Sequence, residues 1–268
     1  MGFKDAKKGT TLCRLEVVER RQVSPHIVRV TLSGEDLGRL PSPGYDHWFR
    51  FFLPQEDGET SFDLPEQLGM AGYLKYLRMP SAVRPIMRNY TVRELRPEAL
   101  ELDIDFVVHG DEGPASRWAQ RVEPGGRVAL LDQGRGYEWA ADTSEHLLVG
   151  DETAMSAILG ILRDLPGDAS GTAIIEVPES ADMQECAAPD GIEVRWIDRS
   201  ASGAGRKPGL LALEALRALV PAAPGTTSAY VCGEQELAAE GRRHLVAAGV
   251  PKARIAFVGY WRAGKAAY

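Results

Sequence analysis

The most regular pattern in the chain is the run Leu100-Glu101-Leu102-Asp103-Ile104-Asp105-Phe106-Val107-Val108. Its apolar residues alternate with acidic ones at a period of two, which indicates a strand with one buried and one solvated face. Residues 27–32 alternate in the same way, and shorter apolar runs occupy residues 48–53 and 127–131. Several short strands separated by Gly and Pro turns are typical of an antiparallel barrel or sandwich. We expect residues 54–85 to form a surface excursion with one short helix.

In the second half of the chain, segments with the two-residue period of a strand alternate with segments that have the 3.6-residue period of a helix. Short apolar runs with strand character are separated by segments with helical spacing, which predicts a mostly parallel sheet covered by helices. Ligands bind such sheets at the carboxyl ends of the strands. We therefore predict two domains, an antiparallel β-barrel over residues 1–141 and an α/β domain over residues 142–268. The expected strands are 146–150, 172–177, 192–197, 228–232 and 255–260, and the expected helices are 153–165, 210–219 and 234–248.

Composition narrows the class of protein. The 268 residues are 44% hydrophobic and 26% charged, as in ordinary globular proteins. Lys and Arg number 31 against 38 Asp and Glu, giving a net charge of −7. This balance argues against binding to nucleic acid or to an anionic membrane surface. No window reaches the roughly 20 apolar residues of a membrane span, and the first residues lack a secretory signal.

Three cysteines lie far apart in the sequence. Cys13, Cys186 and Cys232 form no CxxC pair, so a disulfide framework or an iron–sulfur cluster is not expected. We expect a cytoplasmic protein. No heptad pattern or long exposed apolar helix is visible, so we expect a monomer.

The sharpest local motif is Arg88-Asn89-Tyr90-Thr91-Val92-Arg93, of the form R-x-Y-T-x-R. On a strand, Arg88 and Tyr90 project to one face. A flavin dinucleotide needs an aromatic partner for its ring and positive charge for its pyrophosphate, which Tyr90 and Arg88 can supply. An ordinary strand with surface arginines is the alternative for this motif alone.

A second motif follows at the end of the next strand. Residues 105–110 (Asp-Phe-Val-Val-His-Gly) lead to Gly113-Pro114-Ala115-Ser116, which has the form of a helix start. Gly permits a close backbone approach, and Pro suits the first helical turn. Free amides at such a start form an anion site suited to a pyrophosphate. Taken singly, a Gly-Pro turn and a structural His109 are the simpler explanations.

Taken together and in order, these motifs resemble the siderophore-interacting protein family. Its members are FAD-dependent ferric-siderophore reductases of the ferredoxin-NADP reductase superfamily. The runs 150–154 (Gly-Asp-Glu-Thr-Ala), 232–234 (Cys-Gly-Glu) and 259–264 (Gly-Tyr-Trp-Arg-Ala-Gly) extend the resemblance over residues 14–264. It implies that Arg88, Tyr90, Thr91, His109, Ala115 and Ser116 contact FAD, and that the loops after Gly150 and Cys232 face a nicotinamide nucleotide. The full cofactor-binding set that we predict is Arg88, Tyr90, Thr91, Val92, Arg93, Asp105, His109, Gly113, Ala115, Ser116, Gly150, Asp151, Glu152, Thr153, Arg199, Gly233 and Glu234.

The choice of nucleotide depends on what lies beside the ribose. Arg199 follows the strand 192–197, with Arg206 and Lys207 nearby, and an arginine there favours the 2′-phosphate of NADPH. Asp198 beside it would favour NADH instead. We expect NADPH as the more probable donor and NADH as the alternative; the glycine fingerprint G-x-G-x-x-G is absent from the chain.

The resemblance also implies the substrate and the mechanism. Ferric siderophores are often anionic, and we expect Arg50, Arg262 and Lys265 to bind them; Arg50 stands where relatives frequently have Lys. No residue need act as acid, base or nucleophile, because the flavin carries the chemistry. The five histidines show no metal-binding spacing, so no protein-bound metal is expected.

Two other functions stay open from the sequence. The first is another NAD(P)H-dependent flavin reductase of the same superfamily, which would pass electrons to a different acceptor. The second is a non-enzymatic protein that binds a siderophore or flavin. Ferredoxin is a further possible electron donor, and the sequence does not choose between these.

Overall fold

The computed structural model describes residues 11–66, 69–108, 113–203 and 205–265. The chain forms two compact units. The barrel unit comprises the described chain up to Pro43 and His47–Arg135, and the α/β unit comprises Gly136–Tyr268 together with the short segment Gly44–Asp46. The α/β unit is therefore built from two separate pieces of sequence.

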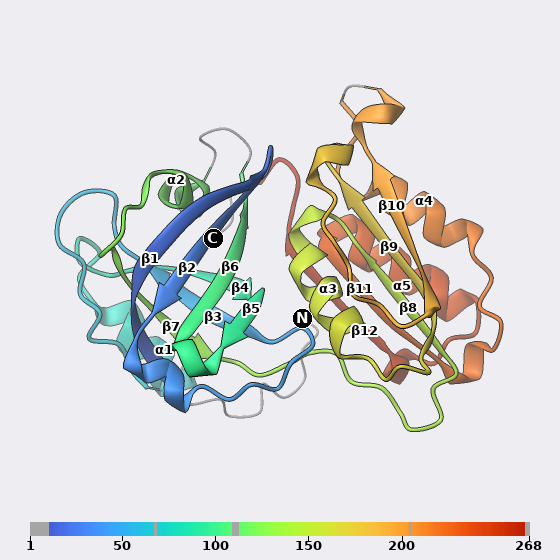
Figure 1. Ribbon diagram of the computed structural model, residues 1–268, viewed down its shortest axis with the longest axis horizontal. Coiled ribbons are helices and arrows are strands. Elements are labelled where there is room, and N and C mark those ends of the chain that lie inside the picture. Colours follow the sequence, from blue (N-terminus) through green and yellow to red (C-terminus); the bar gives the residue numbers. More distant parts are fainter. Residues whose placement is uncertain (1–10, 67–68, 109–112, 204, 266–268) are drawn as a thin grey trace. The chain divides into compact units, whose positions relative to one another are not determined.

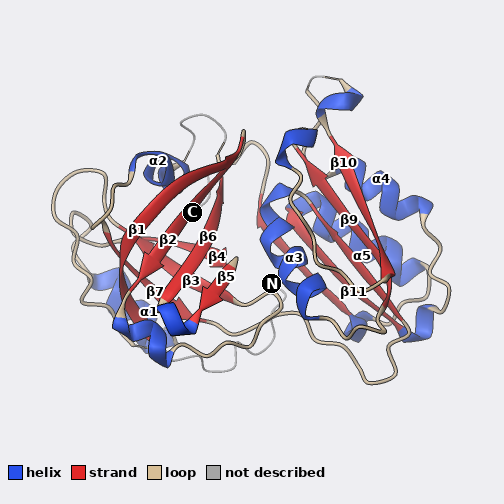
Figure 2. Cartoon of the chain, in the orientation of Figure 1, coloured by secondary structure: helices blue, strands red, loops and turns tan. Residues whose placement is uncertain are grey.

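The barrel unit is a seven-stranded antiparallel sheet that curls on itself (Figures 1 and 2). The strand order is β4-β3-β7-β1-β2-β6-β5. The predicted antiparallel barrel is confirmed. Its elements are β1 (Leu12–Ser24), β2 (Ile27–Ser33), β3 (Trp48–Leu53), α1 (Met70–Arg78), β4 (Ile86–Thr91), β5 (Glu94–Arg96), β6 (Glu101–Val107), α2 (Pro114–Arg121) and β7 (Arg127–Asp132), with short 3₁₀ turns η1 (Glu35–Arg39) and η2 (Pro97–Ala99).

The alternating stretch forms β6, which lies between β2 and β5. Leu102, Ile104 and Phe106 are fully buried in the barrel core, as the pattern predicts. The acidic face is less solvated than we expected. Asp103 is only 4% exposed, because it accepts hydrogen bonds from Thr31 and from the guanidinium of a neighbouring arginine on β5.

Residues 54–85 are more than a surface excursion. Helix α1 packs Tyr76 against Phe52, with the ring centroids 5.9 Å apart. Together with Leu64 and Leu131, these residues form a second apolar cluster on the outer face of the barrel. The excursion is needed because Phe52 and Leu131 point away from the main core and require a cover.

The α/β unit is a five-stranded parallel sheet in the order β10-β9-β8-β11-β12. Helix α3 covers one face of the sheet and helices α4 and α5 the other (Figure 1). The predicted α/β domain is confirmed, and the order reverses between β8 and β11, where ligands bind such sheets. The elements are β8 (Glu145–Gly150), η3 (Glu152–Ala154), α3 (Met155–Asp164), β9 (Ser170–Val177), η4 (Ser180–Asp182), β10 (Gly191–Asp198), η5 (Ser200–Ser202), α4 (Leu210–Ala218), η6 (Pro224–Thr226), β11 (Thr227–Glu234), α5 (Gln235–Ala247), η7 (Lys252–Arg254) and β12 (Ile255–Trp261).

None of the helices in the described ranges combines the length and apolar character that a bilayer crossing requires.

Candidate functional site

The motif R-x-Y-T lies on β4, as predicted. Arg88 pairs in register with Phe51 of β3, and Tyr90 pairs with Phe49. The Tyr90 ring lies 4.5 Å from that of Phe106 and 5.9 Å from that of Phe51. Burial raises the pKa of Tyr90, so its phenol stays neutral. The aromatic residue is thus fixed by the core, while Arg88 and Thr91 beside it are half-buried.

Two further members of the predicted set meet just beyond β4. The Arg93 guanidinium lies 3.5 Å from a carboxylate oxygen of Asp105, and Arg29 lies 2.6 Å from the other oxygen. Val92 is buried in the main core. These three predicted residues therefore hold the strand ends in place around the motif.

Helix α2 begins as the sequence suggested. Gly113 has a φ of 83°, a left-handed value that favours glycine, and Pro114 follows as the first helical residue. No side chain of the described residues caps this helix, and its first turn contains no acidic residue. Ala115 and Ser116 are buried against the barrel. The predicted contact His109 lies outside the described residues.

These features of the barrel unit fit FAD. A helix start without a side-chain cap offers amide groups to a pyrophosphate, and no atom of the described residues, apart from its sequence neighbours, lies within 4 Å of the position that a Cβ of Gly113 would take. Arg88 would add positive charge, and Tyr90 and Thr91 would lie along the ring system. The donor set therefore fits a flavin dinucleotide.

In the α/β unit, Asp151 joins three strand ends at the point where the strand order reverses. One carboxylate oxygen accepts hydrogen bonds from the Thr153 amide at 2.9 Å and the Thr153 hydroxyl at 2.5 Å. The other oxygen accepts from the Glu234 amide at 2.6 Å and from the indole of Trp261 at 3.2 Å. The predicted residues Asp151, Thr153 and Glu234 are thus brought together.

Two glycines allow this close approach. A Cβ on Gly233, which has a φ of 125°, would lie 2.6 Å from the Asp151 carboxylate. A Cβ on Gly150 would collide with Ala154 and Ile158 of the helical segment above it. Gly233 therefore accommodates Asp151, and Gly150 allows helix α3 to pack closely on the sheet.

The predicted residue Arg199 lies in a buried ion cluster. Its guanidinium donates to Glu152 at 2.8 and 2.9 Å and to Glu176 at 2.8 Å. Burial opposes its charge, but the hydrogen bonds and charges of both carboxylates outweigh this and raise its pKa. Glu176 also accepts from the amides of Gly209 and Ala212. Arg199 thus ties the ends of β9 and β10 to the helix start at α4.

The other two cations considered for the nucleotide are also paired. Arg206 lies 3.3 Å from Glu214, and Lys207 lies 3.2 Å from Glu234 and 2.6 Å from Glu236. All three cations named for a 2′-phosphate therefore have carboxylate partners within the α/β unit.

Among the predicted substrate-binding residues, Arg50 is distinctive. It lies on β3 between β4 and β7 and is half-buried. No carboxylate of the described residues pairs with it, and burial lowers its pKa, an effect partly offset by Tyr73. A desolvated cation without a counter-ion is suited to an anionic ligand. Arg262 and Lys265 lie in the α/β unit and are exposed, and the Lys265 amide donates to the Arg262 carbonyl.

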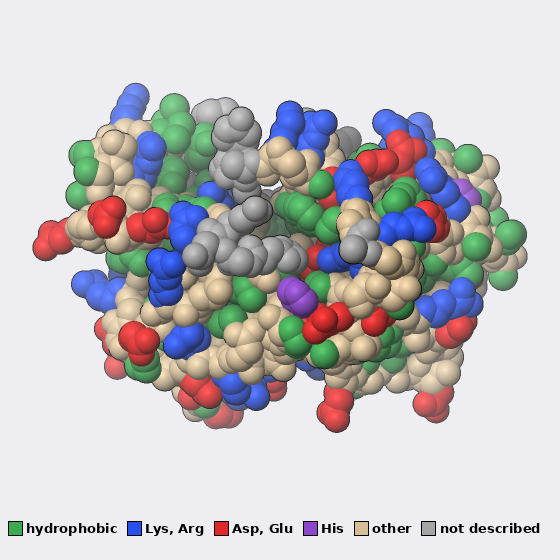
Figure 3. All heavy atoms as spheres, turned by 90° about the horizontal axis from the view of Figure 1, so that it is seen from above, with side chains coloured by type: hydrophobic (Ala, Val, Ile, Leu, Met, Phe, Trp, Pro, Cys, Tyr) green, Lys and Arg blue, Asp and Glu red, His purple; other side chains and the backbone are tan. Residues whose placement is uncertain are grey.

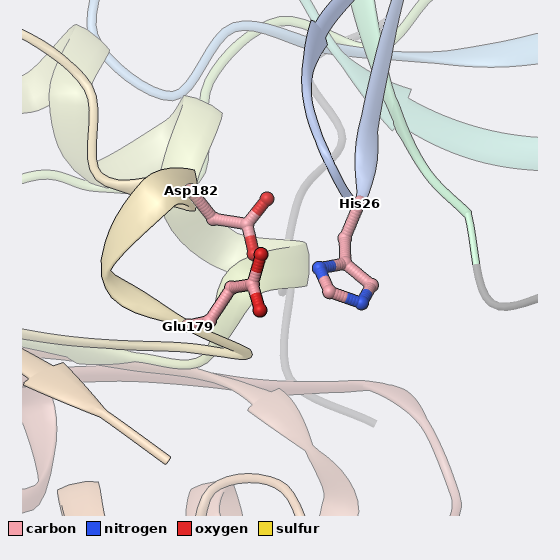
Figure 4. A group of neighbouring side chains, drawn as sticks. All are labelled: His26, Glu179 and Asp182. Atoms are coloured by element: carbon pink, nitrogen blue, oxygen red, sulfur yellow. The ribbon is translucent and has the colours of Figure 1, made fainter. Parts of the chain in front are cut away.

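Figure 4 shows three residues that carry metal-binding groups. His26 lies at the turn between β1 and β2 in the barrel unit. In the α/β unit, Glu179 directly precedes η4 and Asp182 is the last residue of η4. Because they are divided between the units, they form no cluster within either one.

The sequence reasoning missed Glu176 and Trp261. Glu176 is a single acid inside the apolar strand run 173–177, and it is fully buried. A lone carboxylate in a buried strand must be paired, and this signal could have identified it. The role of the Trp261 indole had no signal in the sequence, because its partner Asp151 lies 110 residues away in the chain.

Charged side chains of both signs are mixed over the surface drawn in Figure 3. This distribution agrees with the modest net charge of −7.

Comparisons with known proteins follow the same division of the chain. Residues 16–137 match the family model of the siderophore-interacting FAD-binding domain, and residues 143–264 match that of the siderophore-interacting protein. Ferric vibriobactin reductase ViuB of Vibrio cholerae is 31% identical over 94% of this chain and 89% of its own. An uncharacterized Mycobacterium tuberculosis protein is 32% identical over 96% of this chain and 92% of its own.

Solved structures agree. The siderophore-interacting protein SipS from Aeromonas hydrophila has a TM-score of 0.77 and 34% identity, covering 97% of this chain and 94% of its own. A siderophore utilization protein from T. fusca has a TM-score of 0.78 and 35% identity, covering 95% and 94%. A ferredoxin reductase of carbazole 1,9a-dioxygenase, at 16% identity and a TM-score of 0.64, shares the fold. The predictions of FAD as cofactor and of a flavoprotein oxidoreductase are confirmed, and the chain belongs to the siderophore-interacting protein family.

Proposed function

We propose that this chain is an FAD-dependent ferric-siderophore reductase, which uses NADPH or NADH to reduce siderophore-bound Fe(III) to Fe(II) and so release the iron. One observation carries the proposal most strongly: Arg50 is a half-buried cation without a carboxylate partner among the described residues, on the same unit as the flavin motif. ViuB, the relative from Vibrio cholerae, is named as a ferric vibriobactin reductase.

The residues of the barrel unit would bind and orient the cofactor. The uncapped start of α2, at Gly113, Ala115 and Ser116, would hold the pyrophosphate, with Arg88 adding charge. Tyr90 and Thr91 would fix the ring, and Val92, Arg93 and Asp105 would hold the segment after β4 beside β6. His109 would complete this set. When bound, FAD supplies hydride acceptance from nicotinamide and single-electron transfer to iron.

The substrate would be held by charge. Arg50 would attract an anionic ferric siderophore, and Arg262 and Lys265 would add further positive charge. Fe(II) is a poorer Lewis acid than Fe(III) and binds hard oxygen ligands more weakly, so reduction opens the chelate. The protein needs no acid–base catalyst for this reaction.

The nicotinamide nucleotide would bind at the carboxyl edge of the parallel sheet, facing Gly150, Asp151, Glu152, Thr153, Gly233 and Glu234. The preference for NADPH stays a prediction. Arg199, on which it rested, is largely buried and held by Glu152 and Glu176. The support now comes from Arg206 and Lys207, which also have carboxylate partners but are more exposed, so that a 2′-phosphate could compete for them. Turnover with each nucleotide tests it, and a strong NADH preference would refute it.

The test of the function is an anaerobic absorbance experiment. FAD-loaded protein is mixed with NADPH or NADH, and then with a ferric siderophore and a ferrous chelator. We expect bleaching of the flavin, re-oxidation on addition of the siderophore, and about two trapped Fe(II) per nucleotide oxidised. Bleaching without trapped Fe(II) would indicate a different flavin reductase, and absence of bleaching would indicate a binding protein.

Three related expectations stay predictions. Reduced ferredoxin is a possible alternative donor, to be compared in the same assay. A monomer is expected in solution, which light scattering measures. The cytoplasm is the expected location, since Cys13, Cys186 and Cys232 form no disulfide.

A further inference from the structure

The face of β3 that points away from the barrel core carries Arg50 beside an apolar cluster. Successive side chains of a strand alternate between its two faces, so Phe51 enters the core while Arg50 and Phe52 share the outer face. In register, Arg50 lies opposite Leu131 of β7 and Asn89 of β4. Phe52 and Leu131 belong to the outer apolar cluster against which α1 packs. Arg50 therefore lies at the border of that cluster.

Helix α1 brings two tyrosines to this border. Tyr76 packs on Phe52, and its hydroxyl donates to the Pro85 carbonyl at 2.8 Å, so both ends of its ring are fixed. The ring of Tyr73, one turn earlier, is inclined by only 23° to that of Tyr76, with 6.3 Å between the centroids. Tyr73 also interacts electrostatically with Arg50, where it opposes the lowering of the Arg50 pKa by burial. The Tyr73 ring is thus supported by Tyr76 and lies near the Arg50 guanidinium.

Tyr73 has no evident part in closing the cluster. Its side chain is 39% exposed, whereas that of Tyr76 is 7% exposed. Its hydroxyl has no hydrogen-bond partner among the described residues, and α1 contains no acidic residue that could pair with Arg50. The exposed ring and the guanidinium are therefore both available to one ligand.

Together these two groups suit a particular kind of anion. A guanidinium binds anionic oxygens through charge-assisted hydrogen bonds. An aromatic ring adds affinity for a second ring that lies on its face or its edge. In a catecholate chelate, the oxygens that bind iron are attached directly to benzene rings, so the ligand presents charge and ring side by side. Hydroxamate and carboxylate chelates present oxygens without a ring at the metal.

We propose that Tyr73, acting with Arg50, determines the class of ferric chelate that the chain accepts: catecholate chelates are preferred over hydroxamate and carboxylate chelates. This proposal rests on the proposed function, in which a ferric siderophore is the substrate. Arg50 attracts an anion of any class, and Tyr73 discriminates between the classes. The two residues should therefore respond differently to substitution.

Binding of redox-inert gallium(III) chelates tests the proposal without electron transfer. Titration calorimetry on FAD-loaded protein compares two trianions: gallium(III) held by a hexadentate tris-catecholate, and gallium(III) tris-oxalate, which has no aromatic ring. The wild type should bind the catecholate complex about tenfold more tightly or better. Tyr73→Leu keeps an apolar side chain that favours a helix and loses the ring, so it should weaken the catecholate complex about tenfold and leave the oxalate complex unchanged. Equal wild-type affinities, or a parallel loss for both complexes, would overturn the proposal.

Three variants separate the ring from charge and from general apolar area. Tyr73→Phe keeps the ring and should retain most of the catecholate affinity. Arg50→Gln should weaken both complexes alike, because it removes the charge that both share. Leu74→Ala truncates the next residue of α1, which is 44% exposed, and should change neither affinity. An equal loss in Leu74→Ala, or full catecholate affinity in a folded Tyr73→Leu, would refute the role of Tyr73.

Two further measurements separate this role from the cofactor and from the reaction. Tyr73→Leu should bind FAD as the wild type does, and weaker FAD binding would assign Tyr73 to the cofactor and overturn the proposal. In turnover, the KM for a ferric tris-catecholate should rise about tenfold, with the kcat for a neutral quinone unchanged. If a nicotinamide nucleotide bleaches the flavin but no ferric chelate is reduced, the proposed function fails, and the gallium titration still decides the role of Tyr73.

Discussion

Arg50 is the residue through which substrate binding can be separated from electron transfer. Its guanidinium is half-buried and has no carboxylate partner among the described residues. Because an anionic siderophore would gain a charge-assisted contact there, we expect Arg50→Gln to raise the KM for a ferric siderophore about tenfold. The kcat with a neutral quinone as acceptor should be unchanged. Steady-state kinetics with both acceptors measures this.

Arg50→Lys is the matched control, since it keeps the charge and loses the planar fork. It should retain most of the siderophore affinity. An equal loss with the neutral quinone would mean that Arg50 supports the fold of β3 rather than the substrate.

Asp151 makes the stability of the protein depend on pH. Burial raises its pKa to about 7, and the charge of Glu152 adds to the shift. The folded state keeps a proton that the unfolded chain releases near pH 4, so this contribution is complete below about pH 4 and is lost as the pH rises through about 7. Asp151→Ser should remove a decline of up to about 4 kcal/mol in the free energy of unfolding between those values.

Urea unfolding of both proteins at several pH values in this range measures the difference. A parallel pH dependence in wild type and variant would contradict the assignment to Asp151.

At the scale of elements, the uncapped start of helix α2 can be tested by adding a charge to it. Gly113→Asp would place a carboxylate over amides that are now uncapped, and should weaken FAD binding about tenfold or more. Gly113→Asn is the control, because its side chain is strained by the positive φ in the same way as that of Asp but carries no charge. FAD titration by fluorescence compares them, and equal affinities would show that charge at this helix start is unimportant.

Most elements could be predicted from the sequence, because their periodicity reports burial directly. The strand at residues 48–53 and the helix at 210–219 match β3 and α4 to within one residue. The short helix expected within residues 54–85 is α1, but its packing could not be predicted, since the apolar face that this segment covers is created by outward-pointing Phe52 and Leu131.

The elements that carry the candidate site were more predictable than the contacts of its residues. The motifs identified β4, the start of α2 and the loops after Gly150 and Cys232. The partners of Arg199 were not foreseeable, because Glu152 and Glu176 come from two other segments and meet it only in the folded sheet. Periodicity predicts which face of an element is buried. It does not predict which charged group of a distant segment will pair with a residue of that element.

At the scale of the whole molecule, the segment Gly44–Asp46 belongs to the α/β unit. Asp46 is 2% exposed and accepts from the amides of Gly136 and Tyr137. Asp46→Ala would leave these amides unsatisfied, and we expect a loss of about 2–4 kcal/mol in the stability of the α/β unit. Hydrogen exchange should show faster opening in β8 than in β6.

Asp46→Asn is the control, since it keeps a side-chain acceptor and should destabilise the α/β unit less. Equal acceleration in β8 and β6 would show that the two units unfold together, contrary to this prediction.

The segment Gly44–Asp46 also determines how the α/β unit can be transferred to another protein. Tyr45 donates its amide to Asp164 at 2.5 Å, and Gly160 is a glycine because a Cβ there would lie 2.3 Å from the Tyr45 carbonyl oxygen. On the ribosome, this piece emerges long before the strands that it will join. A chimera that transplants only the C-terminal half into another reductase would therefore lack the segment that packs against Gly160 and Asp164. A successful graft must include Gly44–Asp46 as well.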